Sequence, residues 1–451
     1  MMRDSIDFGR TDISKLFWKL LIPTVLGMVF SAVFVITDGI FVGKGIGSDA
    51  LAAVNITAPL FMITTGIGLM FGVGASVVAS IHLSRGKIKA ANINITQALT
   101  VSSLLIILLS AVCCIFIEPV GKLLGSSERL LPDVTEYMKW YIPFLVAYLL
   151  LSAGMFFIRL DGSPNYAMLC NVVAAVTNII LDYIFIFRFG WGLMGAAFAT
   201  SLGTLLGGLM TLLYLTRLSQ KLRLCRIIIN RKSLQLTYAN IVRMGKLGSS
   251  AFISEASIAY MMFLGNYVFI RYLGEDGVAA FSIACYFFPI IFMVYNAIAQ
   301  SGQPIISYNF GIRNRERISR TVMLMIKAAL ASGICFFMST ALFSRQIVAL
   351  FINESYSAYQ IAVNGLPYFA FGFIFFALNM VGIGYYQSIE KARRAIIITL
   401  LRGIVFMSAG FLLLPLLWDI KGIWLAVPLA ELLTLLFIGG IYARDRLTAR
   451  R

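Results

Sequence analysis

Charged residues are scarce in this chain of 451 residues: Asp, Glu, Lys and Arg together make up 13% of it, against 60% hydrophobic residues. A soluble globular domain carries about 25% charged residues, so this composition excludes a soluble protein. Apolar stretches of about 20 residues, the length that crosses a bilayer, recur along the whole chain. We therefore predict an all-α membrane protein.

Histidine is almost absent, and the six cysteines follow no metal-ligand spacing. An intramembrane enzyme would need a Ser/His, His-Glu-x-x-His or paired-Asp motif at membrane depth, and the single histidine, His82, cannot supply one. We predict that the chain is not an enzyme and needs no cofactor. His82 ends the second apolar stretch beside a basic loop, where it is an interfacial side chain or a proton relay. We interpret the cysteines as core filler.

Twelve apolar stretches are long enough to span a bilayer, which predicts twelve transmembrane helices. No cleavable signal peptide is visible, because residues 1–15 are polar and the first apolar run is too long for an h-region. The predicted spans are residues 16–42, 53–82, 94–117, 135–158, 165–187, 193–216, 246–270, 279–305, 321–343, 360–387, 395–417 and 422–442.

The net charge of +17 is distributed unevenly. If both termini are cytoplasmic, as an even number of spans allows, most Lys and Arg residues fall in cytoplasmic segments. This asymmetry is the positive-inside rule, which fixes orientation. It predicts a multi-pass protein of the plasma (inner) membrane with both termini cytoplasmic, in contact with membrane lipids and not with nucleic acid.

The spans divide into two sets of six that resemble one another weakly. Asp38-Gly-Ile-Phe-Val in the first half matches Asn266-Tyr-Val-Phe-Ile in the second, and Gly195–Thr200 matches Gly422–Val427. We predict two pseudo-symmetric six-helix lobes, residues 1–216 and 244–451, joined by a cytoplasmic linker loop at residues 217–243. Parallel repeats of this kind favour a carrier whose two bundles rock about a central cavity.

Acidic side chains within spans mark ion or substrate pathways, because a charge at the bilayer centre costs roughly 2.5–3.5 kcal/mol on insertion scales. Asp38 and Asp182 lie about 8 Å below the outer ends of their spans, and Thr200 lies at a similar depth. Asn178 shares a helix face with Asp182. We predict one polar pocket at these four residues, in which the two acids are not both ionised when it is empty. The alternative is that the polar groups only hold helices together.

Two further acids lie in spans of the second half. Glu255 falls in the inner part of the seventh span and Glu431 near the middle of the twelfth, neither with an obvious cationic partner in a neighbouring span. We interpret each as a second coupling group or as part of a cation-attracting wall that binds substrate. The alternative is a structural carboxyl that stays protonated.

Several other residues are candidates for a hinge or a cavity wall. Pro23 removes a helix hydrogen bond from the first span and kinks it, which makes it a hinge or a static kink. Gln303 and Pro304 close the eighth span, where a backbone bend lined by amides would serve as hinge or cavity wall. Tyr141 and Tyr295 are candidates to contact flat cations through their ring faces.

Taken together, these residues resemble the multidrug and toxic compound extrusion (MATE) transporters, of prokaryotic type, over nearly the whole chain. Each motif is weak alone, but their order is fairly specific. The motifs are Pro23 followed by Asp38–Gly43, Ala52–Val54, Asn178–Phe185, Gly192–Thr200 and Gly302–Gly311.

The resemblance implies a two-lobed antiporter that exports small organic cations and drugs in exchange for H⁺ or Na⁺. A two-lobed carrier can work as a monomer, which is the state we predict. The resemblance also implies ion coupling at positions matching Asp38 and Asp182 with Asn178 and Thr200, where Na⁺ is a possible ligand, and cation binding at the position of Glu255. Because this chain keeps both sets, H⁺ and Na⁺ both remain open as the coupling ion.

The nearest rival is a lipid-linked oligosaccharide or polysaccharide flippase of the same superfamily. A flippase should have a wide, Arg-rich cavity, whereas no arginine of this sequence lies clearly in mid-span. We therefore favour the exporter.

Overall fold

The computed structural model describes residues 6–227 and 230–448, and every regular element within these ranges is helical. Residues 1–5 and 449–451, at the ends of the predicted lobes, and residues 228–229, in the predicted linker, lie outside the described part. Ten helical segments of the described part are long and apolar enough to span a membrane. Two of them each combine two predicted spans, so all twelve predicted spans are helical and the predicted fold class is confirmed.

Local backbone conformation separates the spans that share one helix. α9 (Arg231–Gly311) is interrupted at Gly274, whose φ of 65° lies in the left-handed region that glycine adopts without strain. α14 (Met407–Thr448) is interrupted at Trp418 and Asp419. Each interruption falls between two predicted spans, so the chain reverses direction there without a long loop.

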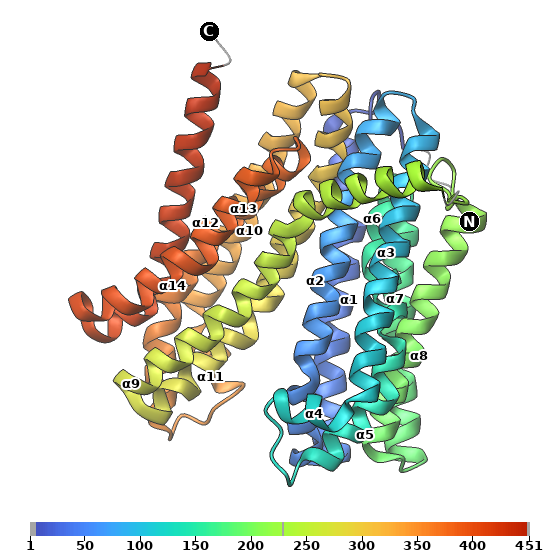
Figure 1. Cartoon of the computed structure of the whole chain (residues 1–451). Coiled ribbons are helices and arrows are strands. Elements are labelled where there is room, and N and C mark those ends of the chain that lie inside the picture. The colour runs from blue at the N-terminus through green and yellow to red at the C-terminus, as the bar shows by residue number, and fades with distance from the viewer. Residues whose placement is uncertain (1–5, 228–229, 449–451) are drawn as a thin grey trace. The chain divides into compact units, whose positions relative to one another are not determined.

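The described residues form two compact units. The first holds the residues up to Phe252 together with Ser307–Asn314, and the second holds the others. Neighbouring helices of the first unit, including α1, α2, α3 and α7, run side by side (Figure 1). The first unit contains α1 (Ile13–Gly45), α2 (Ser48–Ser84), α3 (Ile88–Ile115), α4 (Ile117–Leu123), α5 (Leu131–Tyr141), η1 (Ile142–Phe144), α6 (Leu145–Leu160), α7 (Pro164–Asp182), η2 (Tyr183–Arg188), α8 (Gly192–Leu213), η3 (Tyr214–Leu218) and the start of α9.

The second unit is built around α12, which packs against both α10 and α14. Its elements are the Ile253–Ile306 part of α9, α10 (Arg315–Leu342), α11 (Ser344–Ala349), α12 (Ser357–Ser388), α13 (Ala392–Leu400), η4 (Leu401–Phe406) and α14. Among these, α13, η4 and the first part of α14 form the predicted span 395–417.

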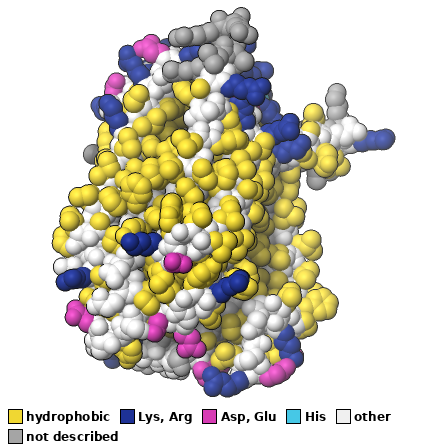
Figure 2. Space-filling model, turned by 90° about the vertical axis from the view of Figure 1, so that its left-hand side faces the viewer, with side chains coloured by type: hydrophobic (Ala, Val, Ile, Leu, Met, Phe, Trp, Pro, Cys, Tyr) yellow, Lys and Arg dark blue, Asp and Glu magenta, His cyan; other side chains and the backbone are white. Residues whose placement is uncertain are grey.

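The surface agrees with a bilayer environment. Large side chains such as Leu104, Leu108 and Ile115 are more than half exposed on α3. Figure 2 shows a face on which hydrophobic side chains dominate, with Lys and Arg side chains gathered towards its upper part. A water-soluble protein would not expose so much apolar surface, so these side chains contact lipid.

Close helix packing in the first unit depends on glycine. A Cβ on Gly74 would lie 1.9 Å from the main-chain oxygen of Met244, and one on Gly248 would lie 1.8 Å from that of Met70. The backbones of α2 and the start of α9 therefore touch, as small residues allow in membrane helices.

The segment after η3 is held by one buried carboxylate at the end of α6. Asp161 accepts hydrogen bonds from the Tyr214 hydroxyl and from the backbone N–H groups of Gln220, Lys221 and Leu222, at 2.7–2.8 Å. The non-helical stretch is shorter than the predicted linker, because residues 231–243 belong to α9.

Candidate functional site

The structure brings together four of the predicted polar residues in the first unit. Asp38 on α1, Asn178 and Asp182 on α7 and Thr200 on α8 are all buried, none of them more than 9% exposed. The Asn178 amide donates to the Thr200 hydroxyl at 3.2 Å, and this hydroxyl donates to Oδ1 of Asp38 at 3.4 Å. Three helices thus supply a single polar cluster, which we call the first-unit cluster.

Packing of α8 on α7 sets the position of this cluster. A Cβ on Gly203 would lie 2.6 Å from the main-chain oxygen of Ala174 and 3.1 Å from Cβ of Asn178. Because Gly203 has no side chain, α8 approaches α7 closely and Thr200 reaches Asn178. A π-helical turn, η2, begins directly after Asp182, and such turns are frequent at functional sites.

Several oxygen atoms of the first-unit cluster are left without a hydrogen bond. Both carboxylate oxygens of Asp182 and Oδ1 of Asn178 are buried and have no hydrogen-bond partner within the described residues. The Asp182 carboxyl nevertheless lies close enough to Asp38 to interact with it electrostatically. Buried acceptors of this kind are costly unless something satisfies them.

The chemistry of these oxygens suits a small cation. Two neighbouring buried carboxyls repel each other when both are ionised, and a bound proton relieves that repulsion. Na⁺ is also compatible, because hard cations take carboxylate, amide and hydroxyl oxygens as ligands. The residues of the first-unit cluster therefore fit either coupling ion.

Two tyrosines of α5, Tyr137 and Tyr141, lie beside the first-unit cluster. Tyr137 was not predicted from the sequence. The Tyr137 hydroxyl lies close to Asp38, Asp182 and Thr200. Tyr141, predicted to contact substrate, follows one turn later with its ring centroid 5.6 Å from that of Tyr137. Its buried hydroxyl has no hydrogen-bond partner in the described part of the chain. The spacing of four residues, which places both rings on one helix face, was the available signal.

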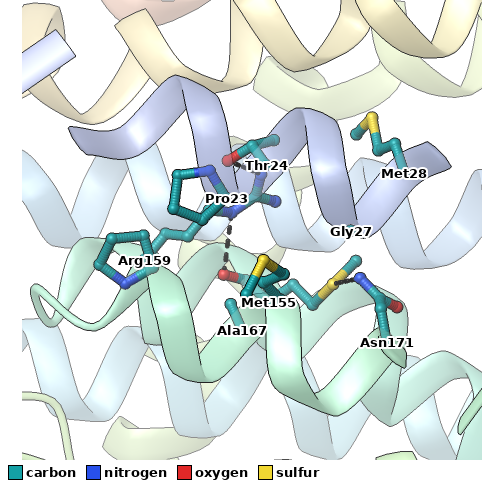
Figure 3. A pocket seen from close by; sticks show the side chains of 10 residues that line it. Pro23, Thr24, Gly27, Met28, Met155, Arg159, Ala167 and Asn171 are labelled. Carbon is teal, nitrogen blue, oxygen red and sulfur yellow. Dashed lines mark hydrogen bonds between the residues drawn. The ribbon is translucent and has the colours of Figure 1, made fainter. Parts of the chain in front are cut away.

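The predicted hinge Pro23 lies in the N-terminal half of α1 beside a small cavity of about 10 Å³ (Figure 3). This volume corresponds to about one water molecule. Next to the proline, Thr24 accepts a hydrogen bond from the buried guanidinium of Arg159 at 3.3 Å. Gly27 faces Asn171 of α7 one turn later. The proline position of α1 is therefore flanked by polar groups of α6 and α7.

In the second unit, Glu431 has a cationic partner, and the expectation that it has none was wrong. Its Oε1 accepts from Nε of Arg402 at 2.7 Å, and both side chains are buried. Arg402 lies in η4, inside a span, so the expectation of no mid-span arginine was also wrong. Sequence reading missed the pair because its members are 29 positions apart and meet only through tertiary packing.

The other predicted residues of the second unit are not all brought together. Tyr295 of α9 is fully buried and interacts with Glu431. Gln303 is buried in α9 beside Pro304, a proline inside that helix. Glu255 is half-buried. Among the described residues, its carboxylate makes no hydrogen bond with Glu431 or Tyr295.

Comparisons with known proteins agree on one family. The family model described as MatE matches residues 23–184 and 251–412, once in each half of the chain. The FAD transporter of Shewanella oneidensis is 26% identical, covering 96% of this chain and 95% of that protein. The multidrug export protein MepA of Staphylococcus haemolyticus is 25% identical, covering 98% of this chain and 96% of that protein. A crystal structure of a MATE in complex with MaL6 covers 99% of both chains with a TM-score of 0.87 at 22% identity.

Proposed function

The chain belongs to the MatE family of multi-pass membrane transporters, and we propose that it exports small organic cations in exchange for H⁺ or Na⁺. The resemblance found in the sequence is thereby confirmed, as is the prediction of a transporter and not an enzyme. The observation that carries the proposal is the first-unit cluster, where Asp38, Asp182 and Asn178 offer buried oxygen atoms to a cation.

In the proposed cycle, the coupling ion and the drug occupy the transporter in turn. Binding of H⁺ or Na⁺ at Asp38 and Asp182 removes the repulsion between their carboxyls and repacks α1 against α7 and α8. Pro23 is the hinge at which α1 bends, and Pro304 plays a corresponding part in α9. Rocking of the two lobes, residues 1–216 and 244–451 about the linker 217–243, then opens the cavity to the other side.

The proposed substrate contacts come from both lobes. Tyr141 and Tyr295 offer ring faces to a flat cation, and Gln303 offers an amide. Glu255 is the acid we assign to cation attraction, since its carboxylate is not engaged by Arg402. Glu431 was predicted for the same role, but its ion pair with Arg402 neutralises it in this structure.

The flippase alternative has to be weighed again, because Arg402 does lie in mid-span. A lipid pyrophosphate would need guanidinium groups that are free to bind it, whereas the Nε of Arg402 is engaged by Glu431 and its guanidinium lies over the ring of Phe376. A single neutralised arginine does not make an Arg-rich cavity. The exporter remains the better supported function.

Topology and assembly complete the proposal. The excess of Lys and Arg in the predicted inner segments supports cytoplasmic termini in the plasma membrane. A two-lobed carrier can work as a single chain, and we propose a monomer surrounded by lipid.

The test is transport by purified protein reconstituted into vesicles. A cationic fluorescent dye should move faster under an imposed pH gradient or under an imposed Na⁺ gradient than without either, and the effective gradient identifies the coupling ion. FAD serves as a second substrate, because the Shewanella relative is a transporter of it. Dye movement no faster than in protein-free vesicles under both gradients would contradict the proposal, and movement of FAD alone would overturn the cationic substrate class.

A further inference from the structure

The second unit contains a buried ion pair that the proposed transport cycle does not use. Nε of Arg402 donates to Oε1 of Glu431 at 2.7 Å, and the two side chains are 3% and 0% exposed. The guanidinium carbon lies 4.3 Å from the ring centroid of Phe376. Such groups within a membrane span are functional candidates by default, because they are expensive to keep there.

Asn379 of α12 fixes the carboxylate in place. Its amide nitrogen donates to Oε2 of Glu431 at 2.7 Å and to the main-chain oxygen of the same residue at 2.8 Å. Both oxygens of the Glu431 carboxylate therefore have donors. A metal cation would have to displace both of these donors, whereas a proton needs only one of the two carboxylate oxygens.

Acceptors for that proton are already present. Oδ1 of Asn379 and the hydroxyl of Tyr295 are buried and have no hydrogen-bond partner among the described residues. Tyr295 is also near enough to interact with Glu431 electrostatically. Buried acceptors without donors are rare in native structures, and here one of them belongs to the amide that already holds the Glu431 carboxylate.

We propose that Glu431 is a second proton-binding site, distinct from the first-unit cluster, and that its protonation opens the ion pair with Arg402. This inference rests on the proposed transport function. The proton adds to a carboxylate oxygen of Glu431, and the new O–H donates to Oδ1 of Asn379. Arg402 remains a guanidinium and loses its counter-charge, so the unit gains one positive charge.

The energetic consequence is a movement of Arg402. A guanidinium without a counter-charge is unfavourable in an apolar interior, so protonation drives Arg402 and the span that carries it towards water. η4 is suited to this movement, because Arg402 is the second residue of a π-helical stretch, which is a local departure from regular helix packing.

Few other titratable groups face this pair. Arg402 is the only titratable residue of η4. The titratable residue of α9 near the pair is Tyr295, which also interacts with Cys335 of α10. α12 contributes Asn379, Phe376 and Met380, which do not titrate. Among the described residues named here, Glu431 and Arg402 are the two that form an ion pair.

The site is not a copy of the first-unit cluster. In the internal repeat, Asn266 of the second half matches Asp38 of the first. The second half thus has an amide where the first-unit cluster has Asp38, and its own pair, Arg402 and Glu431, lies on the eleventh and twelfth spans. A separate site calls for a separate test.

Two measurements on the reconstituted transporter test the proposal. Infrared difference spectra recorded while the pH is lowered should contain the C=O band of a carboxyl in an apolar environment, and Glu431→Gln should remove that component while Asp38→Asn leaves it. The number of protons moved per dye molecule should roughly halve in Glu431→Gln, because one of the two proton-binding sites is gone. If the first-unit cluster uses Na⁺, Glu431→Gln should instead abolish proton movement and leave Na⁺ movement.

The double variant R402Q/E431Q guards against misfolding, because its two neutral amides can hydrogen-bond to each other. It should show the same spectral loss and the same lowered ratio. Glu316→Gln, which removes an exposed acid paired with Arg320, should keep the wild-type ratio. The proposal is overturned if Glu431→Gln retains the whole carboxyl band, or if R402Q/E431Q moves as many protons per dye molecule as the wild type. A wild type that moves no dye would refute the transport function instead, while the infrared band would still decide whether Glu431 binds a proton.

Discussion

Asp38→Asn should collapse the dye gradient that the wild-type transporter builds across a vesicle membrane. At a potential of about 150 mV, each charge moved supplies roughly 3.5 kcal/mol, enough for a concentration ratio of about a few hundredfold. An asparagine keeps the size of Asp38 and can still accept the Thr200 hydrogen bond, but it neither binds a proton nor neutralises Na⁺. The dye ratio should therefore fall towards one, as measured by fluorescence in reconstituted vesicles.

The matched control for this variant is Asp49→Asn. Asp49 lies in the same unit near the start of α2, where its carboxylate forms an exposed ion pair with Arg129. Such pairs contribute roughly 0–1 kcal/mol, so Asp49→Asn should build the wild-type ratio. If Asp38→Asn and Asp182→Asn both keep the wild-type ratio, the first-unit cluster is not where the ion is coupled to transport.

Arg402→Met should destabilise the second unit more than any substitution of an exposed charge. The methionine preserves apolar volume but leaves Glu431 buried without its cation, and breaking a buried pair in this way costs about 3–5 kcal/mol. The double variant R402M/E431Q removes both charges and should recover most of this loss. Unfolding of the purified protein in detergent, followed by circular dichroism, measures the free energy of unfolding of each variant.

Arg394→Met provides the comparison for Arg402→Met. Arg394 of α13 pairs with Asp445 near the end of α14, where both side chains are partly exposed. Solvent screens such a pair, so its loss should lower the free energy of unfolding by no more than about 1 kcal/mol. Equal stabilities of Arg402→Met and Arg394→Met would show that the buried pair contributes little to the fold.

The membrane spans could be predicted from sequence because their cause is local. A run of about 20 apolar residues is sufficient to specify a spanning helix, and all twelve predicted runs are helical. The breaks at Gly274 and at Asp419 fall between predicted spans, because polar residues and glycine interrupt the apolar pattern there. The linker is shorter than predicted, because residues 231–243 form the first turns of helix α9. Their many polar residues gave no sign of a membrane span.

The first-unit cluster could also be anticipated, because helix rise converts sequence position into depth. Asp38, Asp182 and Thr200 were placed at one depth by counting from the ends of their spans, and the structure brings them together. Tyr137 was missed because a tyrosine in an apolar span is usually packing or interface. The Arg402–Glu431 pair was missed because nothing in either span indicates which helix face meets the other.

The central claim is that the ion and the drug compete through the first-unit cluster, and ion release on drug binding tests it most directly. A cationic dye is added to purified wild-type protein in weakly buffered detergent solution, and released H⁺ or Na⁺ is recorded with a pH indicator or an ion-selective electrode. The account predicts release from the wild type in proportion to bound dye, and a much smaller release from the double variant D38N/D182N. Dye binding with the same release from the double variant as from the wild type would contradict it.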